Sequence, residues 1–166
     1  MRTALAILLL TLTAYAQQTA DDPHHAGVNA RGDQAMGFSH DTTTHHFRLY
    51  KDGGAIEVTA NDPQDSGTRE TIRMHLSHIS QMFAAGNFEA PMFIHATNPP
   101  GVPLMKKLKS QIHYRYEDTE NGARVRIQTE NPKAIGAVHD FLRFQIKDHQ
   151  TGDSSAVPPQ SGAMSR

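Results

Sequence analysis

The sequence predicts an α+β domain in which a tandem β-β-α repeat forms a four-stranded antiparallel sheet with two helices packed on one face. Three observations lead to this fold. Two stretches alternate apolar and polar residues around a glycine-containing turn, as β-hairpins do. Each hairpin is followed by a stretch with apolar residues at helical spacing. Finally, both units begin with His-aromatic-Arg and end on Asn closely followed by Pro.

The first hairpin is expected within residues 45–60, HHFRLYKDGGAIEVTA. Phe47 and Leu49 point to one face of the strand, residues 52–54 form the turn, and Ile56 and Val58 continue the apolar face. The second hairpin is expected within residues 112–129, with a turn at Asn121-Gly122. Its inward residues are Ile112, Tyr114, Tyr116, Val125 and Ile127.

The two helices are expected at residues 68–86 and 132–149. Each carries a single apolar stripe, formed by Ile72, Leu76, Ile79 and Phe83 in the first and by Ile135, Val138, Leu142 and Ile146 in the second. A hairpin with one helix is too small to be stable alone, so the two units are expected to share one sheet. His139 lies at the edge of the second stripe and is expected to be buried and hydrogen-bonded.

The predicted domain, residues 42–150, is flanked by segments of different character. Residues 1–16 have the basic start, short apolar run and Ala-x-Ala end of a cleaved signal peptide, which predicts a soluble periplasmic or secreted protein without a membrane anchor. Residues 17–41 lack sustained periodicity and are expected to form an extended arm. The tail, residues 151–166, is rich in Ser, Pro and Gly and is expected to be disordered.

A linker of unusual length, residues 87–110, joins the two repeat units. It contains the sequence PPGVP and a short helical candidate at residues 104–108. Connections of this length usually have a role beyond joining two elements. The off-stripe residues Phe141 and Phe144 of the second helix predict that the arm, the linker or another subunit covers them.

The composition narrows the classes of function. The chain of 166 residues has no cysteine, which excludes disulfides, thiolate metal ligands and cysteine nucleophiles. The formal net charge of −1 gives no basic footprint for nucleic acid or anionic membrane. Eleven histidines and seven methionines are present instead. Imidazole and thioether together suit copper, so one interpretation of the many histidines and methionines is a copper-binding protein. The alternative is a compositional bias without function.

The best metal candidate is one flank of the first helix. His75, His78 and Met82 lie at i, i+3 and i+7, which makes them neighbours on a helix surface. Met92 and His95 in the linker, or Met36, His40 and His45 in the stretch MGFSHDTTTHHF, are expected to supply a fourth coordination position. We expect copper first and zinc second. Haem with axial His and Met ligands is a further candidate, but the sequence contains no haem-attachment motif. The alternative is that Met82 packs at the core edge while both histidines of the flank are solvated.

The exposed sheet face offers a second hypothesis. Strand alternation places His46, Arg48, His113 and Arg115 away from the helices, together with two arginines of the last strand. Arginine binds carboxylates and phosphates in bidentate fashion, so this face is a candidate site for a small anionic ligand or partner. An ordinary polar face, partly paired with glutamates, is the alternative.

Catalysis has the weakest support. The sequence contains no nucleophile elbow, zinc-protease motif, phosphate-binding loop or dinucleotide fingerprint. Histidine acts as a general base near neutral pH, but no nucleophile, acid and base occur at a familiar spacing. The sequence therefore favours a binding protein over an enzyme, and oligomeric state is left open.

Three stretches carry a family resemblance. MGFSHDTTTHHF (36–47), PPGVP (99–103) and FLRFQIKDHQTGD (141–153) resemble uncharacterised exported bacterial proteins rich in histidine. The resemblance extends over most of the chain that follows the signal peptide. It implies export but no particular activity.

Overall fold

The computed structural model describes residues 22–159 and consists of five α-helices, one 3₁₀ helix and four strands. In chain order these are α1 (Pro23–Met36), β1 (Thr43–Tyr50), β2 (Gly53–Ala60), α2 (Ser66–Ala84), α3 (Glu89–His95), α4 (Val102–Lys107), η1 (Lys109–Gln111), β3 (His113–Thr119), β4 (Gly122–Gln128) and α5 (Pro132–Asp148). None of these described helices combines the length and apolar character needed to cross a bilayer. The predicted signal peptide lies outside the described residues.

The strands form one antiparallel sheet with the order β1-β2-β4-β3. Both hairpins form in the predicted stretches, and β2 and β4 pair to join them. The register aligns Phe47, Ile56, Val125 and Tyr116 in one row across all four strands. The α+β class and the four-stranded antiparallel sheet are therefore confirmed.

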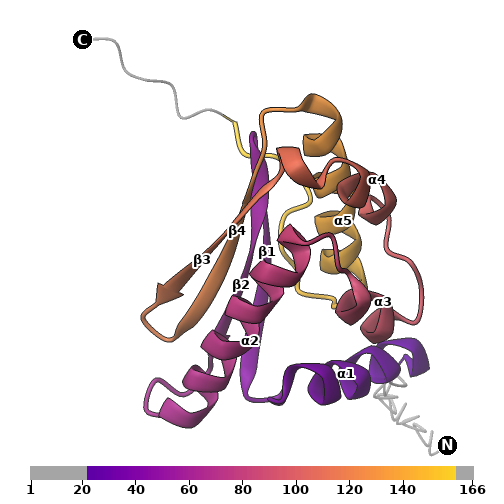
Figure 1. Cartoon of the computed structure of the whole chain (residues 1–166). Coiled ribbons are helices and arrows are strands. Elements are labelled where there is room, and N and C mark those ends of the chain that lie inside the picture. The colour runs from indigo at the N-terminus through magenta and orange to yellow at the C-terminus, as the bar shows by residue number, and fades with distance from the viewer. Residues whose placement is uncertain (1–21, 160–166) are drawn as a thin grey trace, which may run out of the picture.

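Helices α2 and α5 pack against the sheet and enclose the core. Helix α2 contacts β2, β3 and β4, whereas α5 contacts β1 and β2 (Figure 1). Side chains alternate as predicted, since Phe47 is 3% exposed and Val125 is fully buried, while His113 on the opposite face is exposed. Tyr114 is half-buried and packs against the core, as the predicted register requires.

The linker is a folded part of the domain. It forms α3 and α4, and Phe88 just before α3 is fully buried and stacks on Phe83 with a centroid distance of 4.4 Å. Phe88 also contacts Phe141 of α5, so the linker covers that off-stripe residue as predicted. Gly101 has a φ of 83° and brings the linker so close to α5 that a Cβ there would meet the Ala137 carbonyl oxygen at 2.0 Å.

The predicted extended arm is wrong over most of its described length, because Pro23–Met36 forms helix α1. The Asp22 side chain caps its N-terminus, Pro23 occupies the first turn, and Gly37 ends the helix in the left-handed conformation. Its apolar periodicity is weak because few of its residues are buried, mainly Val28 and Gly32. Packing on α3 and the two end caps explain a helix that the sequence pattern does not indicate.

The described part of the predicted disordered tail is also held in place. Residues 151–159 contain no helix or strand, yet the Asp153 side chain is only 5% exposed. Its carboxylate accepts hydrogen bonds from the Phe47 backbone N–H at 2.9 Å and from Arg48 at 2.9 Å. One charged residue in a polar segment therefore ties the chain to the edge strand β1. Residues 160–166 lie outside the described residues.

Candidate functional site

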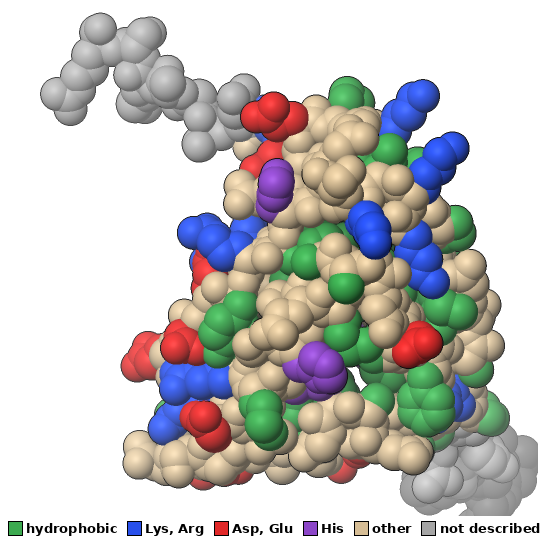
Figure 2. All heavy atoms as spheres, viewed as in Figure 1, with side chains coloured by type: hydrophobic (Ala, Val, Ile, Leu, Met, Phe, Trp, Pro, Cys, Tyr) green, Lys and Arg blue, Asp and Glu red, His purple; other side chains and the backbone are tan. Residues whose placement is uncertain are grey.

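A cavity lies where helices α1, α2, α3 and α5 meet the buried face of β1 and β2. Its volume is about 60 Å³, room for roughly five water-sized atoms. Figure 2 shows a hollow on this side of the molecule, with apolar and histidine side chains at its rim. The walls are formed by Met36, His45, Phe47, Ile56, Val58, His75, Leu76, Ile79, Phe83, Ala90, Pro91, Ile94, His95, Phe141, Gln145 and His149.

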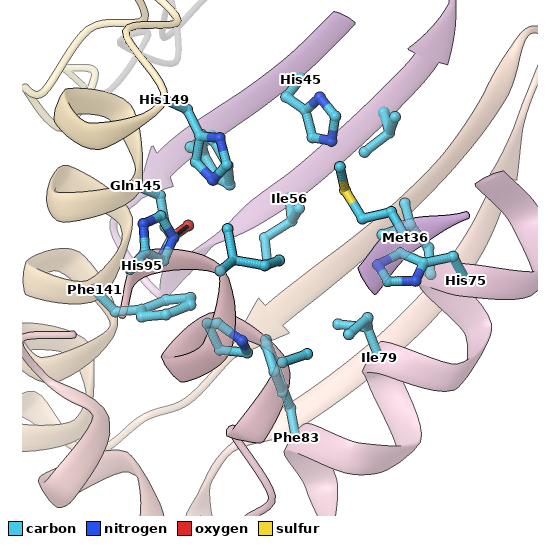
Figure 3. Close-up of a pocket in the computed structure, with 16 residues that line it drawn as sticks. Met36, His45, Ile56, His75, Ile79, Phe83, His95, Phe141, Gln145 and His149 are labelled. Carbon is cyan, nitrogen blue, oxygen red and sulfur yellow. Dashed lines mark hydrogen bonds between the residues drawn. The ribbon is translucent and has the colours of Figure 1, made fainter. Parts of the chain in front are cut away.

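Histidines are concentrated in this apolar cavity. His45 enters it from β1, His75 from α2 and His149 from the residue after α5 (Figure 3). Burial lowers the pKa of His45 to about 4 and the pKa of His149 to about 3, with neighbouring histidines adding to both shifts. Burial, assisted by His78, likewise lowers the pKa of His75 to about 4. These imidazoles are therefore uncharged at neutral pH, with a lone pair on one ring nitrogen.

Met36 adds a thioether to the same space. It is the last residue of α1, and its side chain lies between the rings of His45 and His75 in Figure 3. Phe38 contacts both rings, with centroid distances of 6.0 Å to His45 and 5.7 Å to His75. Helix α1, strand β1 and helix α2 thus bring one sulfur and two imidazoles to one end of the cavity.

The other end is organised by His95, whose side chain is fully buried. Its Nδ1 lies 2.5 Å from Asp148 Oδ2, and its Nε2 lies 2.8 Å from Gln145 Oε1. The second Asp148 oxygen lies 2.7 Å from His24 Nε2, which links α1 to the end of α5. Burial alone would raise the pKa of the Asp148 carboxyl, but the hydrogen bonds from His95 and His24 hold it below its usual range.

Two polar atoms in the cavity wall are buried without a hydrogen-bond partner among residues 22–159. They are His45 Nε2 and Gln145 Nε2. A buried polar group without a partner costs on the order of 1–3 kcal/mol, and such groups are rare in folded proteins. One unpartnered atom belongs to each end of the cavity, so each end presents a contact that a ligand or a water molecule can complete.

The structure brings together only part of the predicted metal set. Met36, His75 and His95 border the cavity, where His45 and His149 join them. The remaining predicted ligands are not among the lining residues. His78 is exposed, Met82 packs at the core edge, Met92 lies 3.9 Å from Lys106 Nζ, and the His40 ring contacts Asp33 at 3.0 Å. His75 and His78 are neighbours on α2, as helical spacing predicts, but only His75 lines the cavity.

The cavity also limits which metal groups fit. Within residues 22–159 no three His, Asp or Glu side chains come together as a metal site, and Met36 is the methionine that borders the cavity. No Asp, Glu, Lys or Arg side chain lines the cavity. The haem expectation is not carried further, because the cavity is small and the sequence has no haem-attachment motif.

The outer face of the sheet is electrostatically balanced. The predicted anion-binding arginines Arg48 and Arg115 each contact a carboxylate, as do the two arginines of β4. The pairs are Arg48 with Asp153 and Glu57, Arg115 with Glu117, Arg124 with Glu117 and Glu57, and Arg126 with Asp52. His46 Nδ1 lies 2.9 Å from Asp153, and His113 is exposed at the far edge. Four arginines thus face four carboxylates, which leaves little excess positive charge for an anionic ligand.

Gln145 and His149 escaped the sequence prediction, which assigned the second helix a single apolar stripe. Together with Phe141 they recur at intervals of four residues and form a second stripe beside the first. Because this stripe is partly polar, its spacing does not by itself predict that it faces inward. It would do so only if a cavity with polar walls were expected. His95 was predicted as a ligand, but its partner Asp148 lies 53 positions away and was not foreseen.

Comparison of the chain with protein-family models, curated proteins and solved structures finds no match in any of the three. The chemistry of the cavity therefore rests on its own residues.

Proposed function

We propose that the protein binds a single Cu(I) ion at one end of the cavity, with Met36, His45 and His75 as its ligands. The observation that carries the proposal is one thioether and two uncharged imidazoles on a shared apolar cavity, with His45 Nε2 lacking a partner among the described residues. Thioether and imidazole are ligands that suit Cu(I), and a site of low coordination number satisfies this ion.

The charge of the cavity favours a monovalent ion over a divalent one. A buried charge is costly unless opposite charge compensates it, and the lining residues include no carboxylate. Zn²⁺ sites use at least three protein ligands, usually Cys, His or carboxylates. Within residues 22–159 no such group of His, Asp or Glu occurs. Copper in its reduced state is therefore the better candidate, and zinc is the weaker one.

The lowered pKa values favour metal binding without proton competition. A histidine must lose its ring proton before it coordinates a metal, so affinity usually falls as the pH drops below the pKa. Burial lowers the pKa of His45 and of His75 to about 4. Both rings are ready to coordinate copper throughout the neutral and mildly acidic range.

The proposal includes an exported location and an internally repeated fold. Export rests on the signal-like residues 1–16. The tandem β-β-α repeat, with both helices on one face, is supported by two hairpins that are each followed by a long helix.

The test is an anaerobic Cu(I) titration of the mature protein against a colorimetric Cu(I) chelator. One ion should bind per chain. The variants Met36→Leu and His75→Gln each remove a ligand, so we expect the affinity to fall by at least about 100-fold, the upper end of the losses seen even for indirect contacts. His78→Gln is the matched control, because this exposed histidine lies on the same helix and should leave the affinity unchanged.

Two results would contradict the proposal. One is the absence of stoichiometric Cu(I) binding by the folded protein. The other is equal loss of affinity in His75→Gln and His78→Gln, which would move the ion to the helix surface. X-ray absorption of the loaded protein provides an independent check, since a sulfur scatterer should be present and should disappear in Met36→Leu.

A further inference from the structure

The His95 end of the cavity has a donor that the protein leaves unused. The Gln145 side chain is 3% exposed, and its Oε1 lies 2.8 Å from His95 Nε2. Its Nε2 is buried and has no hydrogen-bond partner among residues 22–159. An amide nitrogen carries two N–H donors and accepts none, so a group that completes this contact must be a hydrogen-bond acceptor.

Gln145 is held in position by a chain of contacts behind it. Asp148 accepts a hydrogen bond from His95 Nδ1, and the Gln145 oxygen accepts one from His95 Nε2, so this arrangement requires a His95 ring that carries both protons. A hydrogen bond accepted at the amide oxygen strengthens the N–H donors of the same amide. His149 packs edge-on against His95 with a centroid distance of 4.9 Å and closes the side of this arrangement. The donor is therefore preorganised.

The surroundings define the chemistry of an occupant. Phe141, Pro91 and Ile94 contribute apolar walls beside Gln145, and no Lys or Arg side chain lines the cavity. The nearest cationic group, His95, is already paired with the Asp148 carboxylate, so an anion would be desolvated without a free counter-charge and Asp148 would repel it. The volume of about 60 Å³ admits only a small molecule.

We infer that the Gln145 end of the cavity is a binding site for a small uncharged molecule with a carbonyl-type acceptor oxygen. Its oxygen accepts a hydrogen bond from Gln145 Nε2, and its apolar part packs against Phe141 and Ile94. This site does not depend on the proposed copper ion, because it uses different residues at the opposite end of the cavity.

The experiment titrates the metal-free protein with acetone and follows the side-chain amide signal of Gln145 by ¹H–¹⁵N NMR. Acetate is the matched control probe, because it has nearly the same shape but carries a negative charge. Acetone should shift the Gln145 signal in a saturable way and acetate should not. The variant Gln145→Met should bind acetone about fivefold to tenfold more weakly, the loss expected for one hydrogen bond. Gln81→Met, an exposed position on α2, should bind acetone like the unmodified protein.

Three results would overturn the inference. These are equal responses to acetone and acetate, unchanged acetone affinity in Gln145→Met, and a crystal structure grown with acetone in which only water contacts Gln145. The comparison of the two probes on the unmodified protein remains decisive even if Gln145→Met fails to fold. The test contains no metal, so its failure leaves the copper proposal untouched and the reverse is also true.

Discussion

His45 and His46 are consecutive residues that face opposite sides of the same sheet. His45 points into the cavity, where burial lowers its pKa to about 4 and its Nε2 has no partner among the described residues. His46 points to the outer face, where it lies 2.9 Å from the Asp153 carboxylate beside Arg48. One residue type in one strand thus has two environments, because side chains alternate with a period of two.

The difference shows where function and stability reside. On the outer face, charges are paired with charges, and exposed pairs of this kind contribute little free energy each. On the inner face, the rings of His45, His75 and His149 remain uncharged inside an apolar wall, and some polar atoms there have no partner among the described residues, which costs free energy unless a ligand or water completes the contact. The inner face is therefore the candidate for binding, and the outer face carries paired charges that add little to stability.

The strongest test of this contrast is the pH dependence of stability in the metal-free protein. The folded-state pKa values of His45, His75 and His149 are lowered to about 4, 4 and 3 from the usual histidine value of 6.5. Unfolding therefore takes up protons between about pH 6 and 4. Stability is complete above the unfolded pKa and is lost as the pH falls toward the folded values. Three protons correspond to a slope of up to about 4 kcal/mol per pH unit, measurable by urea unfolding at stepped pH.

Single-site variants separate the two faces in the same experiment. His149→Gln removes one titrating group and should reduce the slope by about a third. His113→Gln changes an exposed ring of the outer face and should leave the slope unaltered. The carboxyl groups of Asp148 and Asp153, whose pKa values are lowered, add to the trend only near and below about pH 4. A flat stability profile between pH 6 and 4.5 would contradict the description of the inner face.

A smaller effect is expected from the packing of the inner face. Phe47 is 3% exposed and stacks on His149 with a centroid distance of 5.5 Å, so Phe47→Ala should lower the free energy of unfolding by about 3–5 kcal/mol. Lys51→Ala at the exposed end of the same hairpin should change it by less than about 0.5 kcal/mol. Denaturant unfolding measures both. Comparable values for the two variants would mean that Phe47 does not fill the core.

The smallest effects are expected on the outer face. Asp153→Asn weakens the contacts to His46, Arg48 and the edge of β1, and we expect a loss of about 1–2 kcal/mol. Arg115→Gln breaks an exposed pair and should cost less than about 0.5 kcal/mol. High salt should reduce the second effect more than the first. Amide exchange at Phe47 should accelerate in Asp153→Asn alone, and equal exchange in both variants would disprove the anchoring role.

The sequence predicts the parts of this molecule in which periodicity and burial coincide. The apolar alternation around Phe47 and the stripe that includes Ile72 give the hairpins and long helices, because burial of one face enforces a regular spacing. Helix α1 is not predicted in this way, because the end caps and the packing on α3 that stabilise it leave no periodic apolar pattern in the sequence. The candidate site is predicted only in part, as His75 and Met36 carry metal-ligating chemistry while their convergence depends on tertiary contacts.

The walls of the cavity are drawn from both extremes of the described chain. Met36 comes from the first helix and His149 follows the last one, while His45, His75 and His95 lie between them. Contacts between residues so far apart in sequence require the entropy cost of closing the intervening loops to be met first. A partly synthesised or partly folded chain therefore has no complete cavity. Ligand capture should follow folding as a separate kinetic step, and occupancy of the cavity would report that the whole domain has assembled.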